Sequence, residues 1–445
     1  MTMSLLRRCA RTASLGITAW AILGGGAHAA DFYLKAAATT KTMPAGGPTI
    51  PMWGYVLCDS SFNPLPGQSV QVPGPRLVVP PGDPALNIHL FNGLPPLPPA
   101  APGTETRVTS LVIPELPAAM IPAFFTDGNG NQRVRSFTSE AAPGSVATYS
   151  WTNLRPGTFL YESGTHPSVQ VQMGLYGCVT IDAGAGLAYP GVPYNNEGVL
   201  IFSEVDPGIH AAVDSGAYGT PPYTSTVNYA PKYFLINGAS YPDTLLTSYL
   251  ASAPAVGQNI LLRFLNPGEE THVPVFPDLY MTVYAQDGNL LPYPKQEYSI
   301  ILEAGKTFDA IVTPQTAGLH PIFDRRLRLT NYMSTSGGMI AYMGVPPSGG
   351  GCPAAVGGTL MLAKTPQGTI QFNWGDVSNP SAAYYKIYQS LSASDQYFPL
   401  QDATTPLAPA TGTAGAVGPV PSSSLVFYLV AADVTSPTPC EGPKR

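Results

Sequence analysis

Short runs in which apolar and polar residues alternate recur along the chain, and clusters of glycine and proline separate them. SVATYSWTNL (145–154), MTVYAQDG (281–288) and LVFYLVAADV (425–434) are examples. A period of two is typical of strands that bury one face. No stretch keeps apolar residues at the helical period of 3.6 over several turns. The pattern therefore predicts an all-β protein made of packed sheets.

The strand-like runs fall into three groups. The first occupies residues 30–185, the second occupies residues 186–347, and the third occupies residues 352–445. PPSGGG (346–351) lies before the third group and has the composition of a flexible linker. The length of the chain suits this division, so we expect three successive β-sandwich domains.

The N-terminus has the features of an export signal. Arg7, Arg8 and Arg11 flank the start of the apolar run SLGITAWAILGGGA (14–27), and Ala27-His28-Ala29 is a small-x-small cleavage site. We expect residues 1–29 to be removed and the mature chain to reach the periplasm, the cell surface or the medium. Neither this run nor any later one is long enough to span a bilayer, so no membrane span is expected.

The net charge of the chain limits the classes of macromolecule that it can bind. The formal net charge is −6, and no cluster of lysine and arginine follows the signal. Nucleic-acid-binding proteins carry basic patches, and this chain lacks the composition for one. The sequence therefore excludes nucleic acid as a partner and favours another exported or cell-surface protein.

Four cysteines remain after the signal: Cys58, Cys178, Cys352 and Cys440. An even number in an exported protein suggests disulfides, and four cysteines allow three pairings. We favour Cys58–Cys178 and Cys352–Cys440, because each pair falls within one predicted domain. Free thiols that serve as metal ligands are the alternative.

Three segments of the first two groups resemble the multicopper oxidase family. VPGPRLVVPPGDPALNIHLFNGL (72–94) is similar to a strand pair near the start of that family's first domain. PGTFLYESGTHPSVQVQMGLYGCVTI (156–181) is similar to its P-G-T-Y-W-Y-H-S-H segment, and residues 280–312 follow its middle domain. The resemblance implies two cupredoxin-like (plastocyanin-like) Greek-key β-sandwiches over residues 30–185 and 186–347.

The copper ligands of that family are replaced in this sequence. The resemblance implies four His-x-His pairs around a three-copper cluster, two of them in the first domain. At the corresponding positions this chain has Val112 and Pro114, then Glu162 and Gly164. The third-domain pairs and the His-Cys-His strand of the blue copper have no counterpart. The resemblance thus predicts the fold together with the loss of the catalytic apparatus, and no cofactor is expected unless the family's copper activity survives.

The third group resembles a fibronectin type III domain instead. GTIQFNWGDV (368–377), AAYYKIYQS (382–390) and LVFYLVAADV (425–434) are alternating runs separated by polar turns. Trp374 and Tyr385 are the kind of residues that fill the core of a small sandwich. Such modules usually act as spacers or bind other molecules.

His166 and Glu162 are the candidate metal ligands. They lie four residues apart in the second motif, next to Tyr161. Imidazole, carboxylate and phenol oxygens together suit one divalent ion such as zinc or Cu(II). The alternative is a turn histidine that is hydrogen-bonded to the backbone, for example near Glu162.

The other histidines of the mature chain have structural interpretations. His89 alternates with Ile88 and Leu90, which places it at solvent or at a core edge. His272 follows two glutamates in a loop that we expect to be solvated. His320 precedes an Asp-Arg-Arg run (324–326) that we expect to form an ion-paired corner between the domains.

Three functions compete. The leading hypothesis is an exported multicopper-oxidase-like protein without catalysis, which serves as a binding or surface-assembly module. The second is a copper-dependent oxidoreductase that uses an unorthodox site around Glu162 and His166, or a site completed by a partner. The third is copper storage, which the scattered methionines disfavour because storage proteins have Met- or His-rich tracts.

Overall fold

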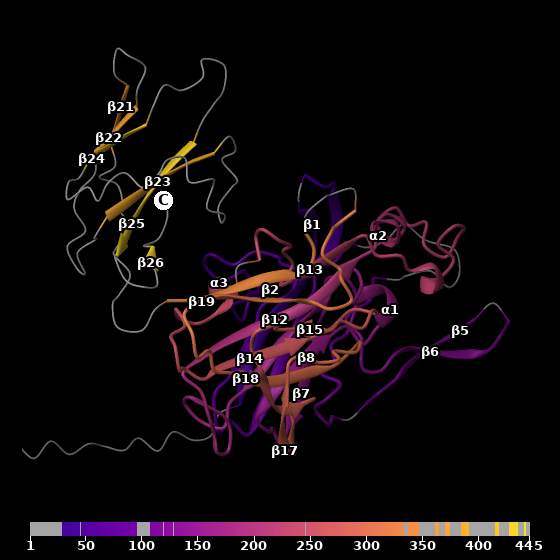
Figure 1. Cartoon of the computed structure of the whole chain (residues 1–445). Helices are drawn as coiled ribbons and strands as arrows, with labels where there is room; N and C mark the ends of the chain where they lie inside the picture. Colours follow the sequence, from indigo (N-terminus) through magenta and orange to yellow (C-terminus); the bar gives the residue numbers. More distant parts are fainter. Residues whose placement is uncertain are drawn as a thin grey trace, which may run out of the picture.

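A computed structural model describes most of the first two groups and the strands of the third. It covers residues 29–346 apart from 45, 96–106, 119, 128, 245 and 333–336, together with six strands between residues 361 and 441. Nearly all regular elements are strands (Figure 1), which confirms the predicted all-β class. The predicted signal peptide, up to residue 28, lies outside the described residues. Within them, no helix has both the length and the apolar character that a membrane crossing requires.

The first sandwich consists of two facing sheets. One sheet has the order β2-β1-β4-β7 and the other has the order β3-β9-β8. Its strands are β1 (Ala30–Thr42), β2 (Thr49–Cys58), β3 (Leu77–Val79), β4 (Ala85–Asn92), β7 (Val146–Thr152), β8 (Gly157–Glu162) and β9 (Tyr176–Ile181). Strand β1 is parallel to β4, and β3 is parallel to β9. Alternating burial along β4 and β7 directs one face of that sheet into the core.

A hairpin projects from the first sandwich (Figure 1). It is formed by β5 (Ala123–Thr126) and β6 (Gln132–Ser136), which pair only with each other. At its base, Ser136 forms an isolated bridge with Thr165. Phe124 faces Val134 across the hairpin, and both side chains are exposed.

The second sandwich is built around a six-stranded sheet of order β13-β12-β14-β18-β16-β17, with a three-stranded sheet β15-β19-β20 beside it. Its strands are β12 (Asn196–Val205), β13 (Tyr233–Ile236), β14 (Ile260–Leu265), β15 (Pro274–Val275), β16 (Met281–Gln286), β17 (Asn289–Glu297), β18 (Thr307–Val312), β19 (Gly318–Asp324) and β20 (Ile340–Val345). The small sheet β10-β11 (Leu187–Tyr189 and Val192–Pro193) precedes it.

The helices are few and short. They are α1 (Pro167–Gln170), α2 (Pro207–Asp214), α3 (Leu246–Tyr249) and the 3-10 turn η1 (Thr226–Asn228). Helix α2 begins after Asp206, whose side chain accepts a hydrogen bond from Gly208 N at 2.8 Å. Pro207 follows at the first helical position, where its missing N–H costs nothing.

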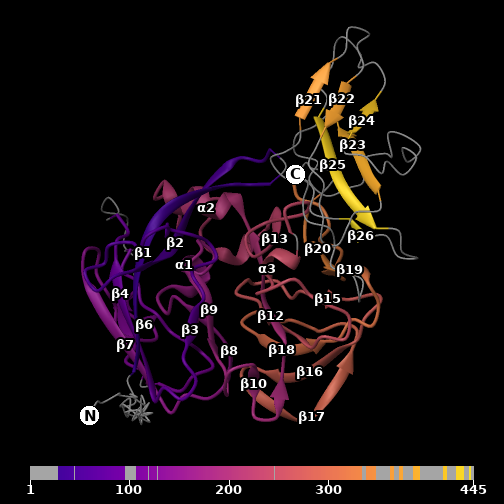
Figure 2. The same cartoon turned by 90° about the vertical axis from the view of Figure 1, so that its left-hand side faces the viewer.

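The two sandwiches lie side by side (Figure 2), and buried side chains of both pack together between them. One apolar cluster joins Leu160 and Cys178 of the first sandwich to Ile201 and Leu265 of the second. Arg263, which is fully buried on β14, crosses the same seam. Its guanidinium contacts Glu197 (2.9 Å), Asp182 (2.5 Å), Asp309 (3.9 Å) and Thr158 Oγ1 (3.0 Å). This buried guanidinium therefore links the two sandwiches through ion pairs and a hydrogen bond.

The third group contributes two further sheets, β21-β22-β24 and β23-β25-β26. Their strands are β21 (Met361–Lys364), β22 (Ile370–Asn373), β23 (Tyr384–Ser390), β24 (Ala414–Val417), β25 (Phe427–Val434) and β26 (Cys440–Glu441). Its likeness to fibronectin type III stays a prediction, as do the three domain boundaries.

The predicted disulfide Cys58–Cys178 is wrong. Both cysteines are buried free thiols. Cys58 ends β2 in one sheet and points its thiol to Val56 O at 3.6 Å. Cys178 lies in β9 of the other sheet, within the apolar cluster at the seam, where burial raises the pKa of its thiol to about 12. The second predicted pair, Cys352–Cys440, includes a residue outside the described ones.

Candidate functional site

The positions that the family resemblance assigns to copper ligands do come together in space. Val112 and Glu162 form an isolated antiparallel bridge: Val112 N donates to Glu162 O at 2.8 Å, and Glu162 N donates to Val112 O at 2.9 Å. Gly164 lies next to Val112. The sequence comparison therefore identified the correct region, and the chain kept the backbone frame that would position two ligand pairs.

The space between these positions is filled by apolar packing. A Cβ atom at Gly164 would lie 2.8 Å from Val112 Cγ1 and 3.0 Å from Ser110 Oγ. Both distances are shorter than ordinary contacts, so a side chain at position 164 would displace its neighbours. Pro114 is exposed and has no donor atom for a metal. Three of the four positions thus hold residues that cannot ligate copper.

A hydroxyl network surrounds the packed contact. Its members are Thr109, Ser110, Ser136, Ser163, Thr165 and Gln170, all at most 1 % exposed. One branch runs from Thr165 Oγ1 to Ser110 Oγ (2.9 Å) and on to Ser136 Oγ (3.0 Å). In the other branch, Gln170 Oε1 accepts from Ser163 Oγ (2.7 Å) and Thr109 Oγ1 (2.9 Å).

This hydroxyl network joins three segments that are distant in the sequence: residues 108–110, residue 136 and residues 163–170. Gln170 Nε2 completes it by donating to Val108 O at 2.7 Å. Every member has at least one neutral hydrogen-bond partner, as buried polar groups require. Thr165 Oγ1 also donates to Glu140 Oε1 at 3.2 Å, and Glu140 is paired with Arg135. The network therefore joins the ligand-bearing segments through neutral side chains and reaches one ion pair at its edge.

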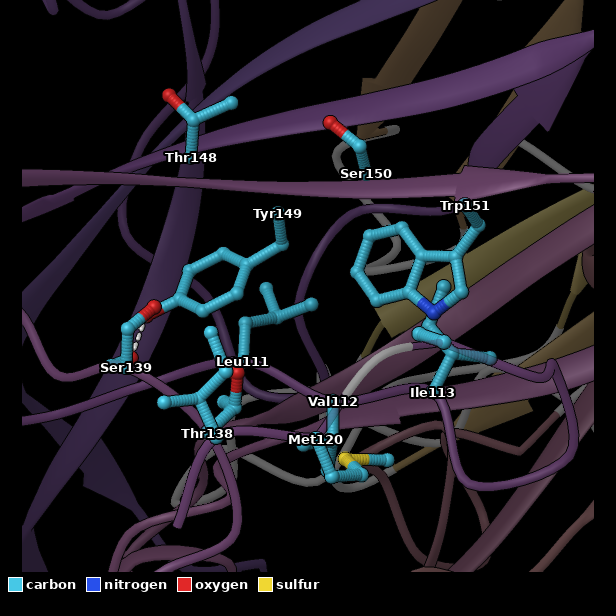
Figure 3. A pocket seen from close by; sticks show the side chains of 12 residues that line it. Leu111, Val112, Ile113, Met120, Thr138, Ser139, Thr148, Tyr149, Ser150 and Trp151 are labelled. Carbon is cyan, nitrogen blue, oxygen red and sulfur yellow. Dashed lines mark hydrogen bonds between the residues drawn. The ribbon is translucent and has the colours of Figure 1, made fainter. Parts of the chain in front are cut away.

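A small cavity of about 120 Å³ opens beside Val112. Figure 3 shows Tyr149 and Trp151 of β7 pointing toward Leu111, Val112 and Ile113, with Met120 on the other side. Tyr149 Oη donates to Ser139 O at 2.7 Å (Figure 3). The lining is apolar and hydroxylic and contains no imidazole or carboxylate. The cavity therefore offers no imidazole or carboxylate ligand, and the phenol of Tyr149 is already engaged with Ser139 O.

Two carboxyl groups near this region are perturbed by burial. Burial raises the pKa of Glu162 to about 7. Burial also raises the pKa of Glu115 to about 8, and the charge of Glu162 adds to that shift. Both carboxyl oxygens of Glu115 are buried without a hydrogen-bond partner among the described residues. These two groups are the ionisable side chains that the chain retains next to the replaced ligands.

His166 occupies a structural position at the start of α1. Its backbone is left-handed (φ 41°), and its N–H donates to Arg135 O at 3.0 Å. Its ring lies 6.3 Å from the ring of Phe125 in the hairpin. Tyr161, the phenol expected beside it, is buried and donates to Pro75 O at 2.8 Å. In the described part of the chain, no three His, Cys, Asp or Glu side chains are arranged to hold a metal; binding by His166 and Glu162 stays a prediction.

The expectation that His272 lies in a solvated loop is wrong. The imidazole is 0 % exposed and lies between two buried carboxylates, with Nε2 3.0 Å from Glu204 Oε2 and Nδ1 3.3 Å from Asp324 Oδ2. Burial opposes protonation, but the two carboxylates prevail and raise the pKa of His272 to about 9. We call this group the His272 clamp; it joins β12, β19 and the loop before β15.

The remaining histidines have local roles. His89 is hydrogen-bonded to Thr148 (2.9 Å) and Asp31 (3.2 Å) at the outer face of the first sheet, which agrees with the predicted edge position. His320 pairs with Asp278 at 2.7 Å, and Asp324 belongs to the His272 clamp. The expected corner of Asp324, Arg325 and Arg326 between the domains is not formed as predicted, because Asp324 pairs with His272 and Arg326 pairs with Glu270 at 3.5 Å, both within the second sandwich.

Sequence reasoning missed the hydroxyl network and the His272 clamp. A signal for the first was present, since Thr109, Ser110, Ser163 and Thr165 are small polar residues that flank the replaced ligands. No local signal indicated the second, because Glu204 and Asp324 are distant from His272 along the chain.

Comparison with known proteins supports the fold and its likeness to copper proteins. Over 249 residues, which are 46% of this chain, it is 25% identical to copper resistance protein A of Pseudomonas syringae pv. tomato. The matched part is 39% of that protein, so the chain spans well under half of its length. No protein-family model matches the chain.

Two solved structures share the architecture. The blue copper oxidase from Nitrosomonas europaea matches 72% of this chain and 86% of its own, with a TM-score of 0.52 and 17% identity. The multicopper oxidase mgLAC matches 72% of this chain and 86% of its own, with a TM-score of 0.51 and 18% identity. The predicted resemblance to multicopper oxidases and the cupredoxin-like sandwich fold are thereby confirmed.

Proposed function

We propose that this chain, which has the fold of multicopper oxidases, is an exported binding or surface-assembly protein that does not perform their copper chemistry. One observation carries the proposal: Val112 packs against Gly164 where the family places metal ligands, at a distance that leaves no room for an imidazole. Fold alone does not define activity. The hydroxyl network supports the proposal because side chains of this chain already join the same segments by hydrogen bonds.

The surface of the first sandwich also supports a binding role. Between residues 120 and 137, five large apolar side chains are about half exposed or more: Met120, Ile121, Phe124, Val134 and Phe137. Soluble monomers seldom gather apolar groups in this way, and such patches mark interaction sites. The partner we propose is another exported or cell-surface protein.

The competing function is copper-dependent oxidation at an unorthodox or partner-completed site. The relatives named above are copper proteins, and Glu162 is a carboxyl at a former ligand position. If copper is bound there, Glu162 would be the available oxygen ligand, with His166 as the nearest imidazole in sequence. A phenol oxidation assay separates the two functions.

The experiment measures oxygen consumption by the copper-loaded mature chain with 2,6-dimethoxyphenol. We expect a rate no higher than that of free copper at the same concentration. Turnover that is lost in the Glu162→Ala/His166→Ala variant and kept in His89→Ala would overturn the proposal. The His89 variant is the matched control because His89 lies on the outer face of the first sheet.

A pull-down from an envelope extract tests the binding role. The wild-type chain is compared with Phe124→Ser/Val134→Ser, and Leu290→Ser in the exposed strand β17 is the control. We expect the hairpin variant alone to lose its partner. Equal capture by all three chains would contradict a role for the hairpin.

A further inference from the structure

The small cavity beside Val112 contains a hydrogen-bond donor that the fold itself does not use. Trp151 of β7 lines this cavity, and only 3 % of its surface is exposed. Its indole Nε1 is buried and has no hydrogen-bond partner among the described residues. A buried indole N–H usually finds an acceptor, because an unpaired donor destabilises the folded state. An acceptor from outside the chain would satisfy this donor.

The donor is directed into the cavity. The indole of Trp151 extends from β7, and its nitrogen is on the edge of the ring that is turned toward Ile113 (Figure 3). Leu111 and Ile113, each at most 1 % exposed, form the buried wall of the cavity. Met120 and Ile121 also line it and are 48 % and 66 % exposed, which places them at its mouth. The cavity therefore leads from the surface toward the indole.

The other polar side chains of β7 at this cavity are already hydrogen-bonded. Tyr149 Oη donates to Ser139 O at 2.7 Å. Thr148 and Ser150 direct their hydroxyls away from the cavity (Figure 3), where they form hydrogen bonds of 2.9 Å and 2.7 Å. Trp151 is therefore the side chain of β7, among those that line the cavity, whose donor is unused.

The walls of the cavity define the chemistry of a ligand. None of the residues that line it is charged, and burying an ion without a counter-charge is unfavourable, so the ligand is uncharged. An indole N–H only donates, so the ligand must carry an acceptor atom. A single water molecule is less suitable, because a buried water needs two to four polar partners, whereas the wall beside the indole nitrogen consists of Leu111 and Ile113.

The volume of the cavity, about 120 Å³, limits the size of the ligand. We propose that the cavity binds a small uncharged carbonyl compound of about six non-hydrogen atoms, since a somewhat larger apolar cavity in another protein holds benzene. The carbonyl oxygen accepts from Trp151 Nε1, and the hydrocarbon part packs against Leu111 and Ile113. This site does not depend on the proposed binding or assembly role, because it requires no partner protein.

The direct test observes the indole N–H by NMR. The mature chain has three tryptophans, Trp53, Trp151 and Trp374, and the Trp151→Phe variant identifies the signal of Trp151 in a ¹H–¹⁵N spectrum. We expect cyclopentanone to move this signal downfield until it saturates, and to leave the other two unchanged. Methylenecyclopentane has the same shape but no oxygen, so it should cause no downfield shift.

Saturation-transfer NMR on variants then separates the hydrogen bond from the apolar contact. Trp151→Phe should weaken the binding of cyclopentanone by about fivefold through loss of one neutral hydrogen bond, and should leave methylenecyclopentane binding unchanged. Ala118→Leu, which fills part of the cavity, should weaken the binding of both probes. Ala211→Leu on the exposed surface of α2 is the matched control and should bind both like the wild type.

The wild-type spectrum decides the question even if Trp151→Phe does not fold, because the signal of Trp151 can be assigned by residue-specific labelling. No shift with cyclopentanone, an equal shift with methylenecyclopentane, or a shift that persists unchanged in Ala118→Leu would overturn the proposal. A contact between the Trp151 N–H and a bound water that cyclopentanone does not displace would assign the donor to that water and would overturn it as well.

Discussion

Each of the two sandwiches joins segments that are distant in the sequence through a buried cluster of polar side chains, and the two clusters differ in their charge. The hydroxyl network of the first sandwich consists of neutral side chains, with one contact to the carboxylate of Glu140, and lies where the family resemblance places metal ligands. The His272 clamp of the second sandwich is charged and lies where no ligand is expected. The Arg263 cluster at the seam is charged as well.

On the function proposed above, this difference explains how the backbone of a metal-binding frame can keep its shape after its ligands are replaced. A metal ion cross-links several loops through their polar side chains, and its loss would leave those side chains without hydrogen-bond partners. In this chain, hydroxyl and amide groups satisfy one another and the backbone, so the segments stay joined. The charged clusters, in contrast, make the stability of the second sandwich and the seam depend on pH and on intact ion pairs.

The largest effect is expected at the seam. Arg263→Leu leaves Glu197, Asp182 and Asp309 without their buried cation, and we expect a loss of about 3–5 kcal/mol in the free energy of unfolding. Urea unfolding measures this loss. The control is Arg133→Leu, whose exposed pair with Asp127 should contribute less than about 1 kcal/mol. Equal effects of the two variants would contradict the role of the Arg263 cluster.

The His272 clamp should produce a pH dependence of stability. The pKa of His272 is raised from 6.5 to about 9 in the folded chain. The stabilisation is therefore fully present below pH 6.5 and is lost as the pH rises through about 9, with a total of about 3 kcal/mol. Unfolding free energies between pH 6 and pH 10 measure it. His272→Gln should be less stable at pH 6 and should lack this decline; a parallel decline would assign it to other groups.

Glu115 should show the opposite sign. Its pKa is raised from 4.5 to about 8 in the folded chain. Between pH 4.5 and pH 8 the carboxyl ionises in the unfolded chain but keeps its proton in the folded chain, so the free energy of unfolding falls as the pH rises through this range. We expect Glu115→Gln to stabilise the chain by about 4 kcal/mol at pH 8 and to have little effect at pH 4.5. Thermal unfolding at the two pH values tests this. Destabilisation at pH 8 would show that the charged form of Glu115 has a partner.

The smallest effect is expected in the hydroxyl network. Ser163→Ala removes a donor to Gln170 and an acceptor for Thr165 N, and we expect a loss of about 1–2 kcal/mol. Because both of these bonds join neutral groups, this loss should be the same at pH 6 and pH 9. Ser168→Ala, on the exposed surface of α1, is the control. A strongly pH-dependent loss would contradict the neutral character of the network.

The sequence predicted the fold well because it is encoded locally. Alternating runs such as residues 145–154 and 281–286 became strands, and the motif at residues 156–181 became β8, α1 and β9. The replaced ligand positions were also predicted correctly as neighbours, because the family's spacing fixes the backbone that carries them.

Contacts between distant segments were not predictable in the same way. His272 meets Glu204 and Asp324 through tertiary packing, which no local pattern reveals. The Cys58–Cys178 pairing failed because membership of one domain does not bring two strands of different sheets within bonding distance.

The central claim is that packing has replaced metal binding at the former ligand positions. The direct measurement is bound copper per mature chain, by mass spectrometry, after aerobic loading with copper and dialysis. The account predicts a value well below one copper per chain, unchanged in Glu162→Ala/His166→Ala. One or more tightly held coppers per chain, lost in that variant, would contradict it.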